Sequence, residues 1–313
     1  MIDLIIPYYN NPEGLKRTLD SINTDIFYVT VIDDNSTIYP PYNPKAHQVF
    51  RYNMNRGPGF ARQWGINKTS NPYIMFIDAG DIFTSYTNQW IVADNIKDYP
   101  EINVFSYSYE REGKQTLATD NRMHGKVYKR EFLEKYNITF SKDSSYLNED
   151  IGFNRTCRII SDAIGNPIYH TKMSFMKQIK DKNSLTQKNN QEALYKNQTR
   201  ALSLVSIHSI NICRKNNIEV KEEINQIAIS LYYWFVRTAA ERPQFIQEAW
   251  MGAKIFYDEF QNEIVPNNLL LGNPKIKQCL SYKNKVSFPI NILRFAHDIQ
   301  LFNEVPKQYI GGD

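Results

Sequence analysis

The chain has 313 residues, of which 42% are hydrophobic and 22% charged, and its formal net charge at pH 7 is +4. This composition excludes a disordered chain, and the length allows one large domain or two smaller ones with buried cores. The positive charge is mild and scattered, so it permits a polyanionic partner without requiring one.

The cysteines and the apolar segments indicate the cellular compartment of the protein. Cys157, Cys213 and Cys279 lie far apart and lack the close spacing of a metal site, which is typical of free thiols in a reducing compartment. The chain starts directly with an apolar strand, without the basic start and longer apolar core of a signal peptide. No segment reaches the roughly 18 apolar residues of a membrane span. We therefore expect a soluble, cytoplasmic protein.

The first 80 residues alternate between expected strands and helices. Residues 2–6 form a short apolar run that ends at Pro7, which is typical of a buried strand. Asn11, Pro12 and Glu13 then provide a cap, a first-turn proline and an early acid for a helix. The same reasoning predicts strands at 28–32, 49–52 and 73–77, a proline-rich loop at 36–48 and a helix at 59–68. This order predicts an α/β fold with a mostly parallel sheet, flanking helices and right-handed crossovers.

The pattern changes near residue 190. Before it, strands are expected at 102–109 and 166–178, and helices at 130–136 and 150–163. After it, helical periodicity predicts helices at 191–214, 219–241, 244–263 and, more weakly, 289–302. We expect two domains: an α/β domain of residues 1–190, and a mostly helical domain of residues 191–313.

Two of the expected strands end in acids. Asp33 and Asp34 follow the second strand, and Asp78 and Asp81 follow the strand at 73–77. Because ligands of open α/β sheets bind at the carboxyl ends of the strands, these acids indicate a nucleotide and metal site. The structural alternative is that they close turns or cap the next helix.

A glycine pair precedes the helix at 59–68. Gly57 and Gly59 would let the backbone approach a ligand closely. Arg62 could then face a diphosphate, or it could be an ordinary solvated helix residue.

In this order, the segments resemble the GT-A fold glycosyltransferases of family 2, which are inverting enzymes that use nucleotide sugars. Residues 5–10 (I-I-P-Y-Y-N) resemble the family's first strand and turn, and residues 31–36 (V-I-D-D-N-S) its V-D-D-G-S segment. Residues 55–65 (N-R-G-P-G-F-A-R-Q-W-G) resemble its N-x-G-x-x-x-A-R-N-x-G stretch, and residues 78–81 (D-A-G-D) stand where its D-x-D-D metal motif lies. The resemblance implies a nucleotide-sugar site formed by Pro7, Tyr8, Tyr9, Asp33, Asp34, Arg62, Asp78 and Ala79.

The resemblance also implies a divalent cation, Mn²⁺ or Mg²⁺, at the donor diphosphate. The family usually has a second carboxylate two residues after the first, and Gly80 occupies that position here. Either Asp81 replaces it, or Asp78 holds the metal ion together with a later ligand such as His170. A metal-independent variant is the remaining alternative.

Glu149 and Asp150 are the candidate catalytic residues. By resemblance, Asp150 is the base that takes the proton of the acceptor hydroxyl, and Glu149 supports it or binds the acceptor. The alternative is that Asn148 or Asp150 caps the following helix, and the two roles are compatible. Residues 124–131 resemble the acceptor half of the family, and residues 182–186 its C-terminal lid; His124 and His170 by themselves are more typical of structural histidines.

We therefore expect inverting transfer of a sugar, with a UDP-sugar as the donor, to a hydroxyl of a saccharide or glycolipid. The helical region would bind the acceptor or form a homodimer. One alternative is a transferase that acts on hydroxymethylated bases of DNA, with aromatic stacking and Lys and Arg contacts. The other is a non-catalytic protein that binds a nucleotide sugar or nucleic acid, which Gly80 in the metal motif favours.

Overall fold

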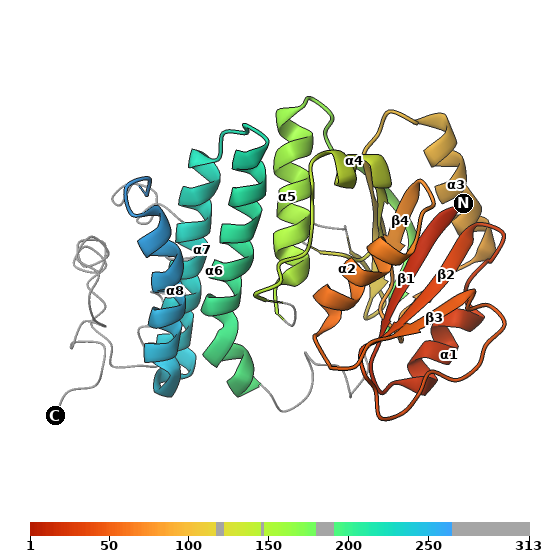
Figure 1. Cartoon of the computed structure of the whole chain (residues 1–313), viewed down its shortest axis with the longest axis horizontal. Helices are drawn as coiled ribbons and strands as arrows, with labels where there is room; N and C mark the ends of the chain where they lie inside the picture. The colour runs from red at the N-terminus through yellow and green to blue at the C-terminus, as the bar shows by residue number, and fades with distance from the viewer. Residues whose placement is uncertain (117–121, 145–146, 180–190, 265–313) are drawn as a thin grey trace. The chain divides into compact units, whose positions relative to one another are not determined.

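The computed structural model describes residues 1–116, 122–144, 147–179 and 191–264. The chain divides into two compact units, Met1–Ser184 and Leu185–Asp313 (Figure 1). The expected helix at 289–302, the lid-like segment 182–186 and Cys279 lie outside the described residues. None of the described helices is both long and apolar enough to cross a membrane.

The first unit is built on a mixed sheet, which in its described part has nine strands in the order β3-β2-β1-β4-β8-β6-β9-β5, with β7 paired to β6. The strands are β1 (Ile2–Tyr8), β2 (Phe27–Asp33), β3 (Gln48–Arg51), β4 (Tyr73–Phe76), β5 (Ile82–Phe83), β6 (Val104–Arg111), β7 (Lys114–Thr116), β8 (Lys126–Lys129) and β9 (Tyr169–Gln178). The first four are parallel to one another, as predicted, and β8 joins antiparallel to β4.

Strand β1 continues through Pro7, where the sequence predicted its end. Its pairing with β4 stops at Ile5, whereas its pairing with β2 runs on to Tyr8. At Pro7, β1 is therefore paired with β2 but no longer with β4. A proline, which has no N–H to donate, is tolerated where a strand has a neighbour on one side only.

Helices cover both faces of this sheet: α1 (Pro12–Asp20), α2 (Pro58–Lys68), α3 (Tyr86–Asp98), α4 (Arg130–Lys135) and α5 (Glu149–Ala163). Alternate residues of β1 point to opposite faces. Leu4 and Ile6 belong to one apolar core with Leu15 of α1 and Val92 of α3. Ile5 faces α2, where a Cβ on Gly65 would lie 2.4 Å from Ile5 Cγ2. The absence of a side chain at residue 65 thus brings α2, and the residues at its start, against the sheet.

The described residues of the second unit are helical, as predicted. Its described part contains α6 (Gln191–Lys215), α7 (Lys221–Glu241), η1 (Pro243–Phe245) and α8 (Ile246–Phe260). Helix α8 approaches α6 closely at Gly252, where a Cβ would lie 2.4 Å from the backbone nitrogen of Arg200. Tyr257 Oη donates to the carbonyl of Ala228 at 2.8 Å and fastens α8 to α7. Within α7, which was predicted as a helix at 219–241, Ile227 and Leu231 are buried.

Candidate active site

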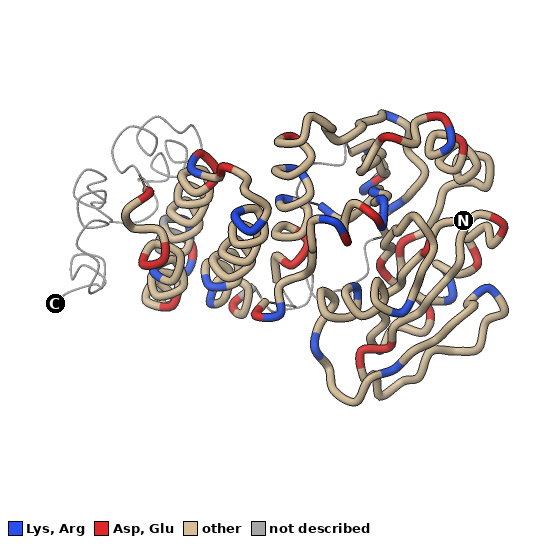
Figure 2. The backbone as a smooth tube through the Cα atoms, turned by 45° about the horizontal axis from the view of Figure 1, so that its top comes forward, with Lys and Arg blue, Asp and Glu red and all other residues tan. Residues whose placement is uncertain are grey.

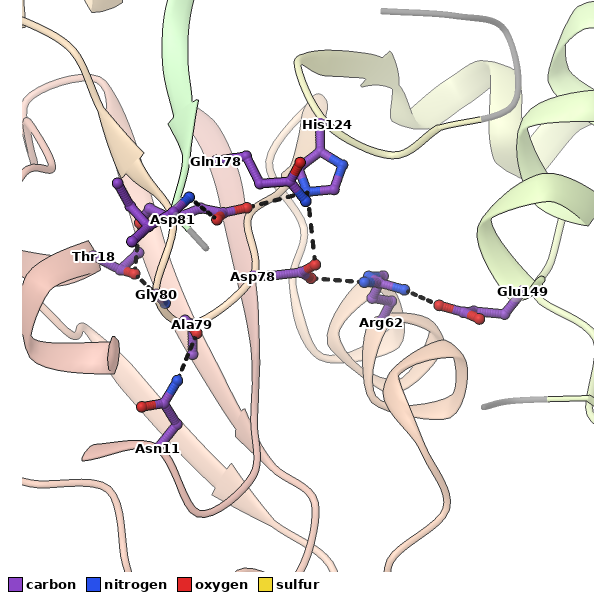
Figure 3. A network of polar contacts seen from close by, with 11 residues as sticks. Asn11, Thr18, Arg62, Asp78, Ala79, Gly80, Asp81, His124, Glu149 and Gln178 are labelled. Atoms are coloured by element: carbon purple, nitrogen blue, oxygen red, sulfur yellow. Dashed lines mark hydrogen bonds and ion pairs between the residues drawn. The ribbon is translucent and has the colours of Figure 1, made fainter. Parts of the chain in front are cut away.

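The turn after β4 presents two acids at the carboxyl edge of the sheet. The N–H of Asp81 donates to the carbonyl of Asp78 at 3.0 Å, and Gly80 between them has a φ of +125°, which favours glycine. Thr18 of α1 fixes this turn: its Oγ1 accepts from Gly80 N–H at 2.9 Å and donates to Asp81 O at 2.7 Å (Figure 3). Asp78 and Asp81 are therefore held on one side of the turn.

His124 completes a group with these two acids. Its Nε2 lies 3.1 Å from Asp81 Oδ2 and 3.8 Å from Asp78 Oδ2 (Figure 3). The ring stacks on Tyr109, and Gln178 Nε2 lies 3.4 Å from His124 Nε2. One ligand atom of each of the three residues lies within 4.8 Å of the others, so two carboxylates and an imidazole form a candidate site for a divalent cation.

The charges of this group depend on one another. Burial raises the pKa of Asp81, although His124 opposes this effect. Burial alone would lower the pKa of His124, but Asp81 and Asp78 outweigh it and raise that pKa. Protein surroundings disfavour ionisation of Asp78, but Arg62 and His124 reverse this and lower its pKa. Asp78 is therefore the readily ionised acid of the pair, and its side chain is 48% exposed.

Arg62 of α2 connects this turn to the start of α5. Its Nη2 contacts Asp78 Oδ1 at 2.7 Å and its Nη1 contacts Glu149 Oε1 at 2.8 Å (Figure 3). The Arg62 side chain is only 4% exposed, so it is not a solvated helix residue. A buried guanidinium between two carboxylates stays charged, and it fixes their separation through directional hydrogen bonds.

Glu149 and Asp150 form the first turn of α5. Burial raises the pKa of Glu149 from 4.5 to about 7, and Asp150 adds to the effect while Arg62 opposes it. Burial also raises the pKa of Asp150, whose Oδ1 accepts from the N–H of Ile151 at 2.9 Å. Asn148 precedes the helix at a φ of +59° and makes no side-chain cap bond. Two adjacent acids with raised pKa values are suited to proton transfer near neutral pH.

Asp33 and Asp34 are enclosed by the protein itself. Asp33 is fully buried and accepts from Ser36 N–H at 2.9 Å and from Arg51 Nη1 at 2.9 Å. Asp34 accepts from the backbone N–H groups of Arg56 at 2.7 Å and Gly57 at 2.8 Å. Both carboxylates hold the loops at the edge of the sheet, and the Arg51 side chain that pairs with Asp33 is 31% exposed.

The turn after β1 borders the same edge. Tyr8 is buried, and its Oη donates to the carbonyl of Ile38 at 2.7 Å. Pro7 is half-buried within the strand, whereas Tyr9 is 52% exposed. Asn11 Nδ2 donates to the carbonyl of Ala79 at 3.0 Å and thereby ties this turn to the one that bears Asp78.

The structure brings together Arg62, the Asp78–Asp81 turn and Glu149 from three separate parts of the sequence, with Asp150 next to Glu149. It adds His124, which the sequence alone left as a structural histidine; the available signal was the resemblance of residues 124–131 to the acceptor half of the family. His170 is exposed on β9 and is not part of the Asp78–Asp81–His124 group.

Residues 3–156 match the model of glycosyl transferase family 2. These residues form a family 2 domain.

Curated relatives of the family 2 domain support the assignment. The glycosyltransferase GlyA of Streptococcus pneumoniae is 25% identical over 193 residues, which cover 48% of this chain and 28% of that protein. An uncharacterized glycosyltransferase of Rickettsia bellii is 35% identical over 91 residues, which cover 26% of this chain and 13% of that protein. The chain thus spans less than a third of the length of either relative.

Solved structures show that the family 2 domain has the GT-A fold that the sequence predicted. S. aureus TarS in complex with UDP-GlcNAc aligns with a TM-score of 0.56 and 14% identity, covering 99% of this chain and 89% of that chain. The mannosyltransferase PcManGT of Pyrobaculum calidifontis, in complex with GDP-Man and Mn²⁺, aligns with a TM-score of 0.51 and 15% identity, covering 96% and 87%.

Proposed function

We propose that the family 2 domain transfers a sugar from a nucleoside diphosphate donor, a UDP-sugar, to a hydroxyl of a saccharide or glycolipid, with inversion at the anomeric carbon. The observation that supports this most directly is the Arg62 bridge. It joins Asp78, at the strand edge where donors bind in open α/β folds, to Glu149 at the start of α5. The sugar nucleotides bound to TarS and PcManGT support the donor class.

Asp150 acts as the general base in this proposal. Its carboxylate takes the proton of the acceptor hydroxyl while the hydroxyl oxygen bonds to the anomeric carbon, and the bond from that carbon to the diphosphate oxygen breaks. The raised pKa of Asp150 makes it a stronger proton acceptor than an exposed aspartate. Glu149 and Arg62 hold the first turn of α5 beside the donor.

Asp78, Asp81 and His124 would hold the divalent cation, Mn²⁺ or Mg²⁺. Their chemistry fits: the carboxylate oxygens suit a hard cation, and the imidazole suits Mn²⁺ as an additional ligand. Asp81 thereby replaces the acid that is missing at Gly80. When bound, the cation would neutralise negative charge on the leaving diphosphate. The helical unit would bind the acceptor or form a homodimer.

Thermal stabilisation of the purified chain by a panel of nucleotide sugars, each with and without Mn²⁺ or Mg²⁺, tests this proposal. A true donor binds the folded state and raises its melting temperature by mass action. We expect a metal-dependent rise with one UDP-sugar, followed by transfer of that sugar to a hydroxyl acceptor. No rise with any sugar nucleotide contradicts the proposal, and binding without transfer or hydrolysis indicates a non-catalytic binding protein.

A further inference from the structure

The charge of this chain is unevenly placed. Between Asp34 and Asp78, residues 35–77 contain five Lys and Arg and no Asp or Glu, so this acid-free segment has a charge of +5. Because the whole chain has a net charge of +4, the remaining residues sum to −1. The backbone coloured by charge in Figure 2 shows acids over many other parts of the described chain. The acid-free segment forms β3, α2, β4 and the loops between them, and its exposed cations belong to β3, α2 and the loop that joins them, with β3 at one end of the sheet.

Three of these cations are available at the surface. Arg56 and Lys68 are exposed, and the guanidinium of Arg51 is partly exposed while it contacts Asp33. They lie over aromatic rings: Arg51 over Tyr39 at 4.3 Å and Arg56 over Phe60 at 4.1 Å. Lys68 lies 5.6 Å from the ring centre of Trp64. Of the other two, Lys45 donates to backbone carbonyls, and Arg62 pairs with the carboxylates of Asp78 and Glu149.

Large apolar side chains project from the same segment. Five that are at least half exposed lie within 17 residues: Ile38 (50%), Tyr39 (66%), Tyr42 (93%), Val49 (52%) and Met54 (53%). Val49 and Arg51 share a face of β3, because side chains of a strand alternate, and Tyr39 contacts Arg51 on that face. Phe50 points to the other face, where Lys68 lies 5.7 Å from its ring centre, so the exposed cations lie on both sides of this edge strand. Apolar side chains that gather at the surface of a soluble domain usually mark an interaction site.

We propose that this surface docks the protein on an anionic lipid bilayer, beyond the transfer reaction and independently of it. Cations attract acidic lipid headgroups, and Tyr, Met and Ile side chains insert at the boundary between headgroups and acyl chains. Ile38, Val49 and Met54 distinguish this surface from a nucleic-acid site, because aliphatic side chains do not stack on bases. Arg56 lies just before the start of α2 and Lys68 is its last residue, so the two exposed cations mark both ends of this helix.

Co-sedimentation of the full chain with vesicles tests the proposal. Vesicles of phosphatidylcholine alone are compared with vesicles of which one third is phosphatidylglycerol, at low and at high salt. We expect binding to the anionic vesicles only, weakened by salt. Each removed cation should lower the partition coefficient about fivefold, so Arg56→Ser/Lys68→Ser should lower it about twentyfold to thirtyfold. Tyr42→Ser/Met54→Ser should weaken the binding that persists at high salt.

The matched control is Lys97→Ser/Met251→Ser, which removes an exposed cation and an exposed apolar side chain elsewhere. Its vesicle binding should equal that of the wild type. Wild-type protein that stays in solution with anionic vesicles overturns the proposal, as does an Arg56→Ser/Lys68→Ser variant that binds them as tightly as the wild type. Binding to a single-stranded oligonucleotide but not to vesicles assigns the surface to nucleic acid. Self-association that Tyr42→Ser/Met54→Ser abolishes, without vesicle binding, assigns it to a second copy of the chain.

Discussion

Asp150 and Glu149 are neighbours with different surroundings. Glu149 is tied to Arg62, whereas Asp150 is half-buried and bonded to its own helix. A substitution of Asp150, the proposed base, should therefore leave the ion pair between Glu149 and Arg62 in place. Asp150→Asn should lower kcat by about 10²–10⁴-fold while the dissociation constant of the donor changes little. Steady-state kinetics together with calorimetry of donor binding measure both. An Asp150→Asn variant with wild-type kcat would remove Asp150 from the mechanism.

The raised pKa of Glu149 links stability to pH. Folding raises this pKa from 4.5 to about 7, so folding favours the protonated form. The stabilisation is complete below about pH 4.5 and is lost as the pH rises through 7. Glu149→Gln keeps an acceptor for Arg62 but cannot ionise. Relative to this variant, the wild type should lose about 3 kcal/mol of unfolding free energy between pH 4.5 and pH 8. Urea unfolding across this range measures the difference; a difference independent of pH contradicts the assignment.

Gly80 is not simply a missing metal ligand. A Cβ at this position would point to Asn11 Nδ2 at 3.7 Å and Arg17 Nη2 at 3.8 Å, both in or next to α1. Gly80→Asp should therefore leave the affinity for Mn²⁺ unchanged, and the φ of +125° should cost about 1–2 kcal/mol of stability. Gly113→Asp is the control, since Gly113 has a φ of +74° and open space around it. Metal titration would contradict this account if Gly80→Asp bound Mn²⁺ more tightly.

Among the elements, β1 and α4 are joined by a buried ion pair at the edge opposite the site. Arg130 Nη2 contacts Asp3 Oδ2 at 2.9 Å, and Arg130 also donates to the carbonyls of Asn71 and Ile66. Arg130→Ala would leave the fully buried Asp3 without its cation, at a cost of about 3–5 kcal/mol in unfolding free energy. Donor affinity of the folded protein should not change. Glu131→Ala, at an exposed neighbour, should stay within about 0.5 kcal/mol in the same urea experiment.

The regular elements were predictable where local pattern determines them. Short apolar runs predicted the parallel strands β1, β2 and β4, the last two of which lead into acids, and the cap at Asn11 predicted α1. Helix α3 and the two-residue strand β5 were not predicted. Helix α3 exposes Trp90 and Ile91 next to buried Val92, so its apolar residues do not form a single stripe.

The candidate site was predictable only in part, because its contacts join distant residues. The acids at the strand ends could be proposed from their positions. The ion pairs of Arg62, 16 residues from Asp78 and 87 from Glu149, depend on how α2 and α5 pack and have no local pattern. The same holds for His124, which approaches Asp81 through the loop before β8.

At the scale of the whole molecule, a destabilising substitution in one compact unit should not change the thermal unfolding of the other. Gly252→Ala places a Cβ 2.4 Å from the backbone nitrogen of Arg200, so α8 must shift away from α6, at about 1–3 kcal/mol. In scanning calorimetry, the melting temperature of the helical unit should fall. The melting temperature of the family 2 domain, which sugar nucleotides should raise, should stay unchanged. The exposed Met251→Ala is the control. A shift of both transitions by the same amount would show that the units unfold as one.

The bonds of Asp34 have an entropic consequence. By accepting from the N–H groups of Arg56 and Gly57, this side chain fastens the start of α2 to the end of β2 before any ligand arrives. Asn10 likewise binds Ser36, Thr37 and Ile38, so the neighbouring loop is ordered in advance. Loops that are already ordered lose little conformational entropy when a nucleotide binds to them. Contacts between the donor and these loops therefore contribute to the binding free energy with little entropic cost. Asp34 and Asn10 would in this way strengthen donor binding without touching the donor.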